Sequence, residues 1–198
     1  MFVPLPLFLS LAANCAPTVA PETLQAVVRI ESGFESLAVG VNGEPDVQVR
    51  ASTIAEASAA VRALVKQGRS VDLGLGQINS RNLNRLGLTI EAAFDPCRNL
   101  AAAGAILAAA YAQARPHRTD DQAGLRAALS IYNTGDATRG LRNGYVARVL
   151  NAVPQVGATV ETPTAPSPSW DVFGHTQATD VFLITLAAPE ASPSGEAP

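Results

Sequence analysis

The sequence predicts a mainly α-helical α+β domain with a small β element, followed by a C-terminal tail without a core of its own. Three observations support this prediction. The chain has 198 residues, which suits one domain of about 150 residues with an appendage. Hydrophobic residues make up 47% and charged residues 16% of it, so a packed core can form. Alanine supplies much of the hydrophobic fraction, which favours closely packed helices over a β-sandwich.

Charge and proline content divide the chain near residue 154. All 14 Lys and Arg residues lie before that point, whereas five of the 17 acidic residues and several prolines follow it. Such a composition is typical of an extended linker. We therefore expect a domain over 15–154 and an acidic tail over 155–198 that is disordered or binds a partner. Apolar stretches around Trp170 and Phe182 have the size of docking motifs, and collapse onto the body is the alternative.

Residues 1–14 match an export signal only in part. The stretch is apolar and has small residues near its end, but no Lys or Arg precedes it, and Pro4 and Pro6 interrupt it. A truncated or atypical export signal, which we favour, and a buried N-terminal segment are both open. No run of roughly 18 hydrophobic residues exists, so no membrane span is expected.

Helical periodicity accounts for the start of the domain. Pro21 and Glu22 suit the first turn of a helix, because proline lacks the N–H that would be unpaired there and an acid favours the positive end. Apolar residues at helical spacing follow, and Gly33 ends the helix. Glu31 lies on the apolar stripe of this helix.

The remaining elements follow in order. Residues 34–50 combine turn residues with short valine-rich pieces, which predicts a small β-hairpin or an irregular lobe. In residues 73–78 glycines alternate with apolar residues, which suits a close backbone approach followed by a helix through Leu83. Helical spacing and composition predict four further helices, over 53–66, 96–114, 119–132 and 144–152. The alanine-rich helix over 96–114 should be the longest and the most buried.

Cysteine and histidine usage makes a metal site improbable. Cys15 and Cys97 belong to no metal-ligand pair, and neither His117 nor His175 has a neighbour of ligand type, so no metal and no cofactor is expected. In an oxidising compartment the cysteines could close a disulfide worth about 4–5 kcal/mol by loop entropy. Two unrelated buried thiols are the alternative, and His117 should lie on the surface.

Glu31 is the best candidate for chemistry from the residues alone. A carboxyl group on the inner face of a helix is costly when ionised, so burial raises its pKa and holds the proton near neutral pH. A general acid needs this property. No Lys or Arg occupies the neighbouring helical positions, where it would lower the pKa again. A solvated or capping glutamate is the alternative.

Three ordered motifs carry a resemblance to a known family. IESGF (30–34), GLGQIN (74–79) and IYNTG (131–135) resemble the motifs of the lysozyme-like soluble lytic transglycosylases. VDLGLGQINS (71–80), AFDPC (93–97) and NGYV (143–146) look like the specialised branch encoded with type IV secretion and conjugation systems. The resemblance covers roughly residues 13–153 and implies the fold shared by goose-type lysozymes and these transglycosylases.

The resemblance also implies an activity, which is cleavage of the β-1,4 bond between N-acetylmuramic acid (MurNAc) and N-acetylglucosamine (GlcNAc) in peptidoglycan. A single carboxyl group, matched here by Glu31, acts first as acid on the glycosidic oxygen and then as base on the muramoyl 6-hydroxyl. The product is a 1,6-anhydro sugar, so the reaction needs no second acid, unlike most glycosidases. The implied role is local opening of the cell wall for assembly of a type IV secretion or conjugation apparatus.

Further site residues follow from the same resemblance. Ser32 should position the substrate beside Glu31, and the Tyr132 hydroxyl should orient the carboxyl group. Gly76 stands where many relatives carry methionine, so a side-chain contact with the glycan should be missing. Asn79 either supports the groove or caps a helix. The implied substrate-binding residues are Ser32, Gly74, Gly76, Gln77, Asn79, Tyr132 and Asn133.

Two neighbouring residues stay ambiguous. Asp72 is the best candidate for an auxiliary acid, although a structural hydrogen-bonding role is favoured. Tyr145 either stacks on a sugar ring or packs against the terminal helix. Cys15 and Cys97 match a cysteine pair of the specialised branch, which favours the disulfide and a periplasmic location.

The expected partners are peptidoglycan glycan strands and, through the tail, components of the secretion apparatus. Nucleic acid is not expected. Two other functions stay open: a goose-type lysozyme-like hydrolase, in which water attacks, and a non-catalytic scaffold that binds peptidoglycan or secretion components.

Overall fold

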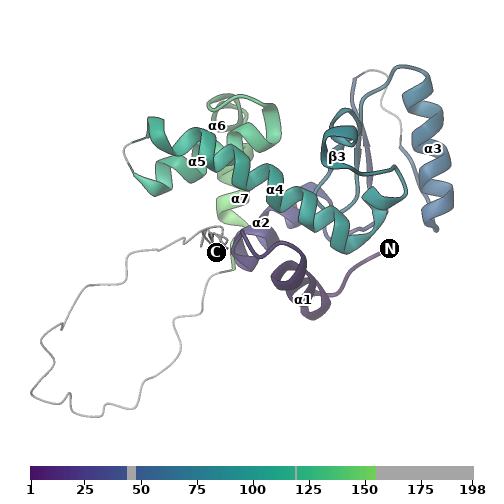
Figure 1. The fold of residues 1–198 in the computed structure, drawn as a ribbon, viewed down its shortest axis with the longest axis horizontal. Helices are drawn as coiled ribbons and strands as arrows, with labels where there is room; N and C mark the ends of the chain where they lie inside the picture. The colour runs from purple at the N-terminus through teal and green to yellow at the C-terminus, as the bar shows by residue number, and fades with distance from the viewer. Residues whose placement is uncertain (44–47, 119, 155–198) are drawn as a thin grey trace, which may run out of the picture.

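A computed structural model describes residues 1–43, 48–118 and 120–154, and the predicted tail with its two apolar stretches lies outside them. The described part is mainly helical, with a small antiparallel sheet in a lobe to one side (Figure 1). This confirms the predicted fold class. The α-helices and strands are α1 (Leu5–Cys15), α2 (Pro21–Glu31), β1 (Val39–Val41), α3 (Ile54–Lys66), β2 (Val71–Leu73), β3 (Ile78–Asn79), α4 (Pro96–Ala114), α5 (Asp121–Thr134), α6 (Arg139–Arg142) and α7 (Tyr145–Asn151). The 3-10 turns are η1 (Ser80–Asn82), η2 (Asn84–Leu86), η3 (Ala92–Phe94) and η4 (Arg115–His117).

Helix α4 is the central element, and it begins and ends where the sequence predicts. The Asp95 side chain caps its start by accepting the Arg98 N–H at 2.9 Å. Its small residues let neighbours approach closely: a Cβ placed on Gly104 would lie only 2.9 Å from the Cβ of Ala16. Leu100 is fully buried on this helix. Helices α1 and α5 pack directly on α4, whereas α3 packs on β2 in the lobe to one side.

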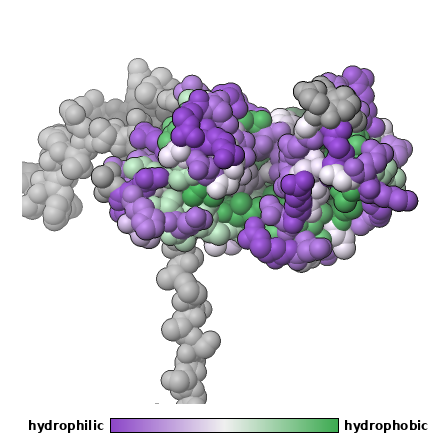
Figure 2. All heavy atoms as spheres, turned by 90° about the horizontal axis from the view of Figure 1, so that it is seen from above, coloured by the Kyte–Doolittle hydropathy of each residue, from purple (hydrophilic) through white to green (hydrophobic). Residues whose placement is uncertain are grey.

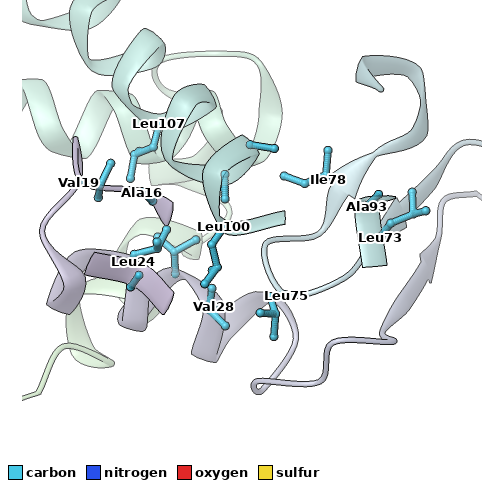
Figure 3. Packing of buried hydrophobic residues seen from close by; sticks show 14 of the residues in the cluster. Ala16, Val19, Leu24, Val28, Leu73, Leu75, Ile78, Ala93, Leu100 and Leu107 are labelled. Carbon is cyan, nitrogen blue, oxygen red and sulfur yellow. The ribbon is translucent and has the colours of Figure 1, made fainter. Parts of the chain in front are cut away.

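The packing between α2 and α4 forms the base of the domain. Figure 3 shows Leu24 and Val28 of α2 next to Leu100 of α4. All three side chains are fully buried. Because α7 also packs on α2, the C-terminal end of α2 is enclosed by helices.

The N-terminal helix α1 is part of the folded domain. Phe8 and Ala12 are fully buried, and the helix packs on α4 and α2. Packed structure therefore includes α1, ahead of the boundary expected at residue 15. No helix in the described part is long and apolar enough to cross a membrane.

A disulfide joins the end of α1 to the start of α4. Cys15 and Cys97 are 82 positions apart in the chain, and their Cα atoms lie 5.4 Å apart. The bond ties the N-terminal helix to the central one.

The small sheet is assembled differently from the prediction. Among the described residues of this stretch, 34–43 and 48–50, the one strand is β1, and its partner is not local: β1 pairs antiparallel with β2, which follows α3 in the chain, and Gly40 lies opposite Asp72. Strand β2 then turns back into β3 through Gly74, whose φ is +72°. The helix expected through Leu83 is replaced by the 3-10 turns η1 and η2. The strands β1, β2 and β3 and the turns η1 and η2 form the β lobe (Figure 1).

Candidate active site

A groove of about 1130 Å³ runs between the β lobe and the helices α5 and α6. One face of α4 forms its floor, the segment from β2 to η2 forms one wall, and the end of α5 with the start of α6 forms the other. Figure 2, seen from above, shows apolar surface between two hydrophilic lobes. Glu31, Asp72, Gln77, Asn79, Tyr132 and Asn133 are among the lining residues.

Glu31 is the last residue of α2, and its carboxyl group faces this groove. The Tyr145 hydroxyl, at the start of α7, donates a hydrogen bond to Glu31 Oε1 at 2.5 Å. Burial raises the pKa of Tyr145, as does the neighbouring Glu31, so the phenol keeps the proton that it donates. The packing of α7 on α2 therefore gives the carboxyl group one fixed donor.

The environment of Glu31 favours its protonated form. Burial, the largest cause, raises the pKa of Glu31 to about 7, although the hydrogen bond from Tyr145 lowers it. The negative charge of Asp72 raises this pKa further, and Arg148 lowers it. A carboxyl group with such a pKa can both donate and accept a proton at neutral pH. This is the property that the sequence predicted for Glu31.

The two tyrosines near Glu31 make different hydrogen bonds. The hydroxyl of Tyr132 donates to the Gly76 carbonyl at 2.6 Å, and it makes no hydrogen bond to Glu31. Tyr145 is the residue that holds the carboxyl group, and it is only 2% exposed, so its ring cannot stack on a sugar. Chain spacing alone does not distinguish the two phenols, because both lie far from Glu31 in the sequence. The hydrogen bond to the Glu31 carboxyl group thus comes from Tyr145, a donor that the sequence had not assigned to it.

The glycine-rich turn between β2 and β3 is held by hydrogen bonds to Asn99 of α4, a residue that the sequence analysis did not single out. Asn99 is 1% exposed on α4, and its Oδ1 accepts the Gly76 N–H at 2.7 Å. Its Nδ2 donates to the carbonyls of Leu73 and Ala93, at 2.9 and 2.6 Å. A polar amide within an alanine-rich buried helix was the available signal. Asn99 thus positions the turn that precedes β3.

Gly74 and Gly76 face the protein interior. A Cβ at Gly74 would lie 2.4 Å from Asn99 Nδ2, and one at Gly76 would lie 2.7 Å from the Ala103 Cβ and 2.9 Å from the Tyr132 hydroxyl. Neither glycine lines the groove. A larger side chain at position 76 would therefore meet the Ala103 side chain of α4 and the Tyr132 hydroxyl first.

Asn79 and Asp72 form a polar cluster on the β-lobe wall. Asn79 Nδ2 donates to Asp72 Oδ1 at 2.6 Å, and Asn42 Nδ2 donates to Asp72 Oδ2 at 2.7 Å. The Oδ1 of Asn79 accepts the Arg81 N–H at 3.1 Å and so caps η1. Asn79 therefore combines the two roles that the sequence proposed as alternatives. The Asp72 carboxylate faces the groove with both oxygens hydrogen-bonded.

The remaining predicted residues are divided between two hollows. Gln77 lines the groove, and its amide donates back to the Gly74 carbonyl at 2.9 Å. Asn133 lines the same groove on the α5 wall and accepts from Asn143 at 3.1 Å. Ser32 lies in a separate hollow beside β1, where its hydroxyl donates to its own helix. Within the described ranges, no cluster of His, Cys, Asp and Glu side chains could hold a metal ion.

Comparisons with known proteins identify the family. Residues 8–149 match the family described as Transglycosylase SLT domain. Protein virB1 of Agrobacterium fabrum (strain C58 / ATCC 33970) is 39% identical over 175 residues, covering 84% of this chain and 70% of the relative. Type IV secretion system protein virB1 of Brucella abortus biovar 1 (strain 9-941) is 40% identical over 149 residues, covering 72% of this chain and 62% of that protein. No solved structure matches the chain. Since the family match spans most of the chain, the protein belongs to the Transglycosylase SLT domain family.

Proposed function

We propose that this protein is a lytic transglycosylase that cleaves the β-1,4 bond between MurNAc and GlcNAc in peptidoglycan, with Glu31 as its only acid and base. The observation that carries the proposal is the buried carboxyl group of Glu31 in the groove, held by Tyr145 and with its pKa raised to about 7. The family match supports the reaction class.

The reaction begins with protonated Glu31. Its proton moves to the glycosidic oxygen while the bond from that oxygen to C1 of MurNAc breaks, and the GlcNAc side leaves as an alcohol. The carboxylate of Glu31 is then stabilised by the Tyr145 hydroxyl. It accepts the proton of the MurNAc 6-hydroxyl as that oxygen bonds to C1. The 1,6-anhydro ring closes, Glu31 is protonated again, and water takes no part.

The charge of Asp72 assists this sequence from the opposite wall. Positive charge develops at C1 as the glycosidic bond breaks, and a fixed negative charge in the same groove lowers the energy of that state. The same charge raises the pKa of Glu31 and so helps to keep the acid protonated. The two amide donors from Asn42 and Asn79 hold the carboxylate in place.

The cellular role follows from the relatives. One relative is named as a type IV secretion system protein, so we place this protein at the cell wall, in the periplasm, where it opens peptidoglycan for such an apparatus. The disulfide between Cys15 and Cys97 suits that oxidising compartment. Residues 155–198 are the proposed contact with secretion components. Their removal should leave glycan cleavage intact but impair secretion, and loss of cleavage would contradict this role.

A lysozyme-like hydrolase is the second candidate, because Asp72 places a second carboxylate in the groove. Mass spectrometry of the released muropeptides separates the two reactions, since an anhydro product is lighter by one water than a reducing-end product. We expect only anhydro products from the wild type and a loss of about 10³-fold in rate for Glu31→Gln. Reducing-end products would favour the hydrolase. No cleavage by the wild type, together with unchanged biological activity in Glu31→Gln, would favour a non-catalytic scaffold.

A further inference from the structure

Four arginines line the groove. Arg69 donates hydrogen bonds to the carbonyls of Asn42 and Gly43, and the other three are Arg81, Arg85 and Arg139. Arg81 lies on η1 and Arg85 on η2, so both belong to the β-lobe wall. Arg139 begins α6 on the opposite wall. All three are exposed, so their guanidinium groups meet whatever occupies the groove from both of its sides.

None of these three side chains forms an ion pair or a side-chain hydrogen bond within residues 1–43, 48–118 and 120–154. Asp136 lies near enough to Arg139 that the arginine contributes to lowering the pKa of its carboxyl group, so the charge of Arg139 is partly balanced. Arg81 and Arg85 take part in none of the ion pairs formed by the described residues. The outer part of the groove therefore offers cationic donors without described carboxylate partners.

The charge pattern selects among ligands. The sugar rings of a glycan strand carry no charge, so they do not require three guanidinium groups. A stem peptide, which hangs from the lactyl group of MurNAc, carries free carboxylates, and guanidinium binds carboxylate in a planar, two-bond geometry. A uniform polyanion fits less well, because Glu31 and Asp72 face the same groove.

We propose that Arg81, Arg85 and Arg139 bind the carboxylates of stem peptides, so that the enzyme cleaves peptide-bearing glycan in preference to stripped glycan. The proposal rests on the proposed transglycosylase function and adds a substrate class to it. Glu31 performs cleavage and Asp72 assists it, and the three arginines determine which stretch of glycan binds next to these carboxyl groups.

The test compares three substrates: native peptidoglycan, peptidoglycan whose peptide carboxylates have been amidated, and glycan strands stripped of peptides by an amidase. We expect wild-type kcat/KM to be highest on native material. The variant Arg81→Gln/Arg85→Gln/Arg139→Gln should lose about 3- to 150-fold in kcat/KM on native material, from roughly 0.2–1 kcal/mol for each of three exposed pairs. On amidated and stripped substrates it should equal the wild type.

A control variant carries Arg98→Gln and Arg126→Gln, which remove two exposed arginines outside the groove, against three in the test variant. It should behave as wild type on all three substrates. The wild-type preference should shrink as NaCl rises from about 50 to 500 mM, because salt screens exposed charges.

Each other outcome has a defined meaning. If the triple variant loses activity equally on all substrates, or on none, carboxylate recognition by these arginines is wrong. If the wild type prefers amidated to stripped glycan as strongly as it prefers native to stripped glycan, the enzyme recognises the bulk of the peptide and not its charge. If the wild type releases no anhydro product from any substrate, the proposed transglycosylase function fails instead. Activity on stripped glycan reports that the variant is folded.

Discussion

Two carboxyl groups face one groove from regions that are built differently. Glu31 ends a helix, is largely buried, and receives one hydrogen bond, from Tyr145. Asp72 lies in a strand and receives two, from Asn42 and Asn79. On the helical side, burial keeps water away from the Glu31 carboxyl group, which favours its protonated form. On the β-lobe side, two amide groups donate the hydrogen bonds that a charged carboxylate such as Asp72 needs. The different environments of the two carboxyl groups, and not their residue types, thus make Glu31 an acid and Asp72 a fixed negative charge.

The sequence explains how each environment arises. In β2, Val71 and Leu73 are fully buried, and the strand alternation turns Asp72 between them toward the groove. Glu31 follows the buried pair Val27 and Val28 at helical spacing, so it lies on the inner face of α2. Glu31 is also at the C-terminal end of α2, where the partial negative charge of the helix end disfavours a negative charge on the carboxyl group.

The largest expected effect tests the buried side of this comparison. Because the pKa of Glu31 is about 7 in the folded protein and 4.5 for a solvated glutamate, as in the unfolded chain, the folded state holds the proton more tightly. The stability from this proton is complete below about pH 4.5 and is lost as pH rises through about 7, a change of about 3 kcal/mol. Relative to Glu31→Gln, which does not titrate there, the wild type should lose that amount of unfolding free energy between pH 4.5 and 8.

Urea unfolding of both proteins across this pH range measures the difference. Other titrating groups are common to the two proteins and cancel. A wild-type stability that runs parallel to that of Glu31→Gln at every pH would contradict the raised pKa and, with it, the contrast between the two carboxyl groups.

The second prediction concerns the donor to Glu31. Tyr145→Phe removes a hydrogen bond to the carboxylate that forms during the reaction, and such bonds are worth about 1.5–3 kcal/mol, so kcat/KM should fall by about 10- to 100-fold. The same bond lowers the pKa of Glu31, so its loss should move the alkaline limb of the pH–rate profile above pH 7. Tyr132→Phe breaks the bond to Gly76 and should leave the limb in place. A shift in Tyr132→Phe, without one in Tyr145→Phe, would reverse the two assignments.

Local patterns predicted the helical side well. Capping residues, apolar spacing and alanine content located α2, α3, α4, α5 and α7 close to their observed bounds, because these signals act within a few residues of each other. Glu31 was found in the same way, since its place on an apolar stripe is a property of one helix. The acid is therefore visible from the sequence before any contact is known.

Contacts between distant segments were not predictable in this way. The Tyr145 hydroxyl reaches Glu31 across 114 positions, and β1 finds its partner β2 only after α3 has intervened. Both depend on how α7 and the β lobe dock on the helices, which no local periodicity encodes. The apolar N-terminus was ambiguous for a related reason, because an export signal and a buried helix share one composition. Its place in the core depends on packing against α4.

The smallest expected effect tests the charged side. In Asp72→Asn, an amide group would face the donors of both Asn42 and Asn79, so one donor loses its acceptor, and the charge that favours the transition state is removed. We expect kcat/KM to fall about 10-fold, less than for Glu31→Gln, with only anhydro products. Loss of the Asp72 charge should also lower the pKa of Glu31 and move the alkaline limb below pH 7. Glu22→Gln removes one charge from the exposed start of α2 and should leave the limb unmoved. A loss in Asp72→Asn as large as in Glu31→Gln would make Asp72 a second catalytic acid, and the two sides of the groove would then share the chemistry.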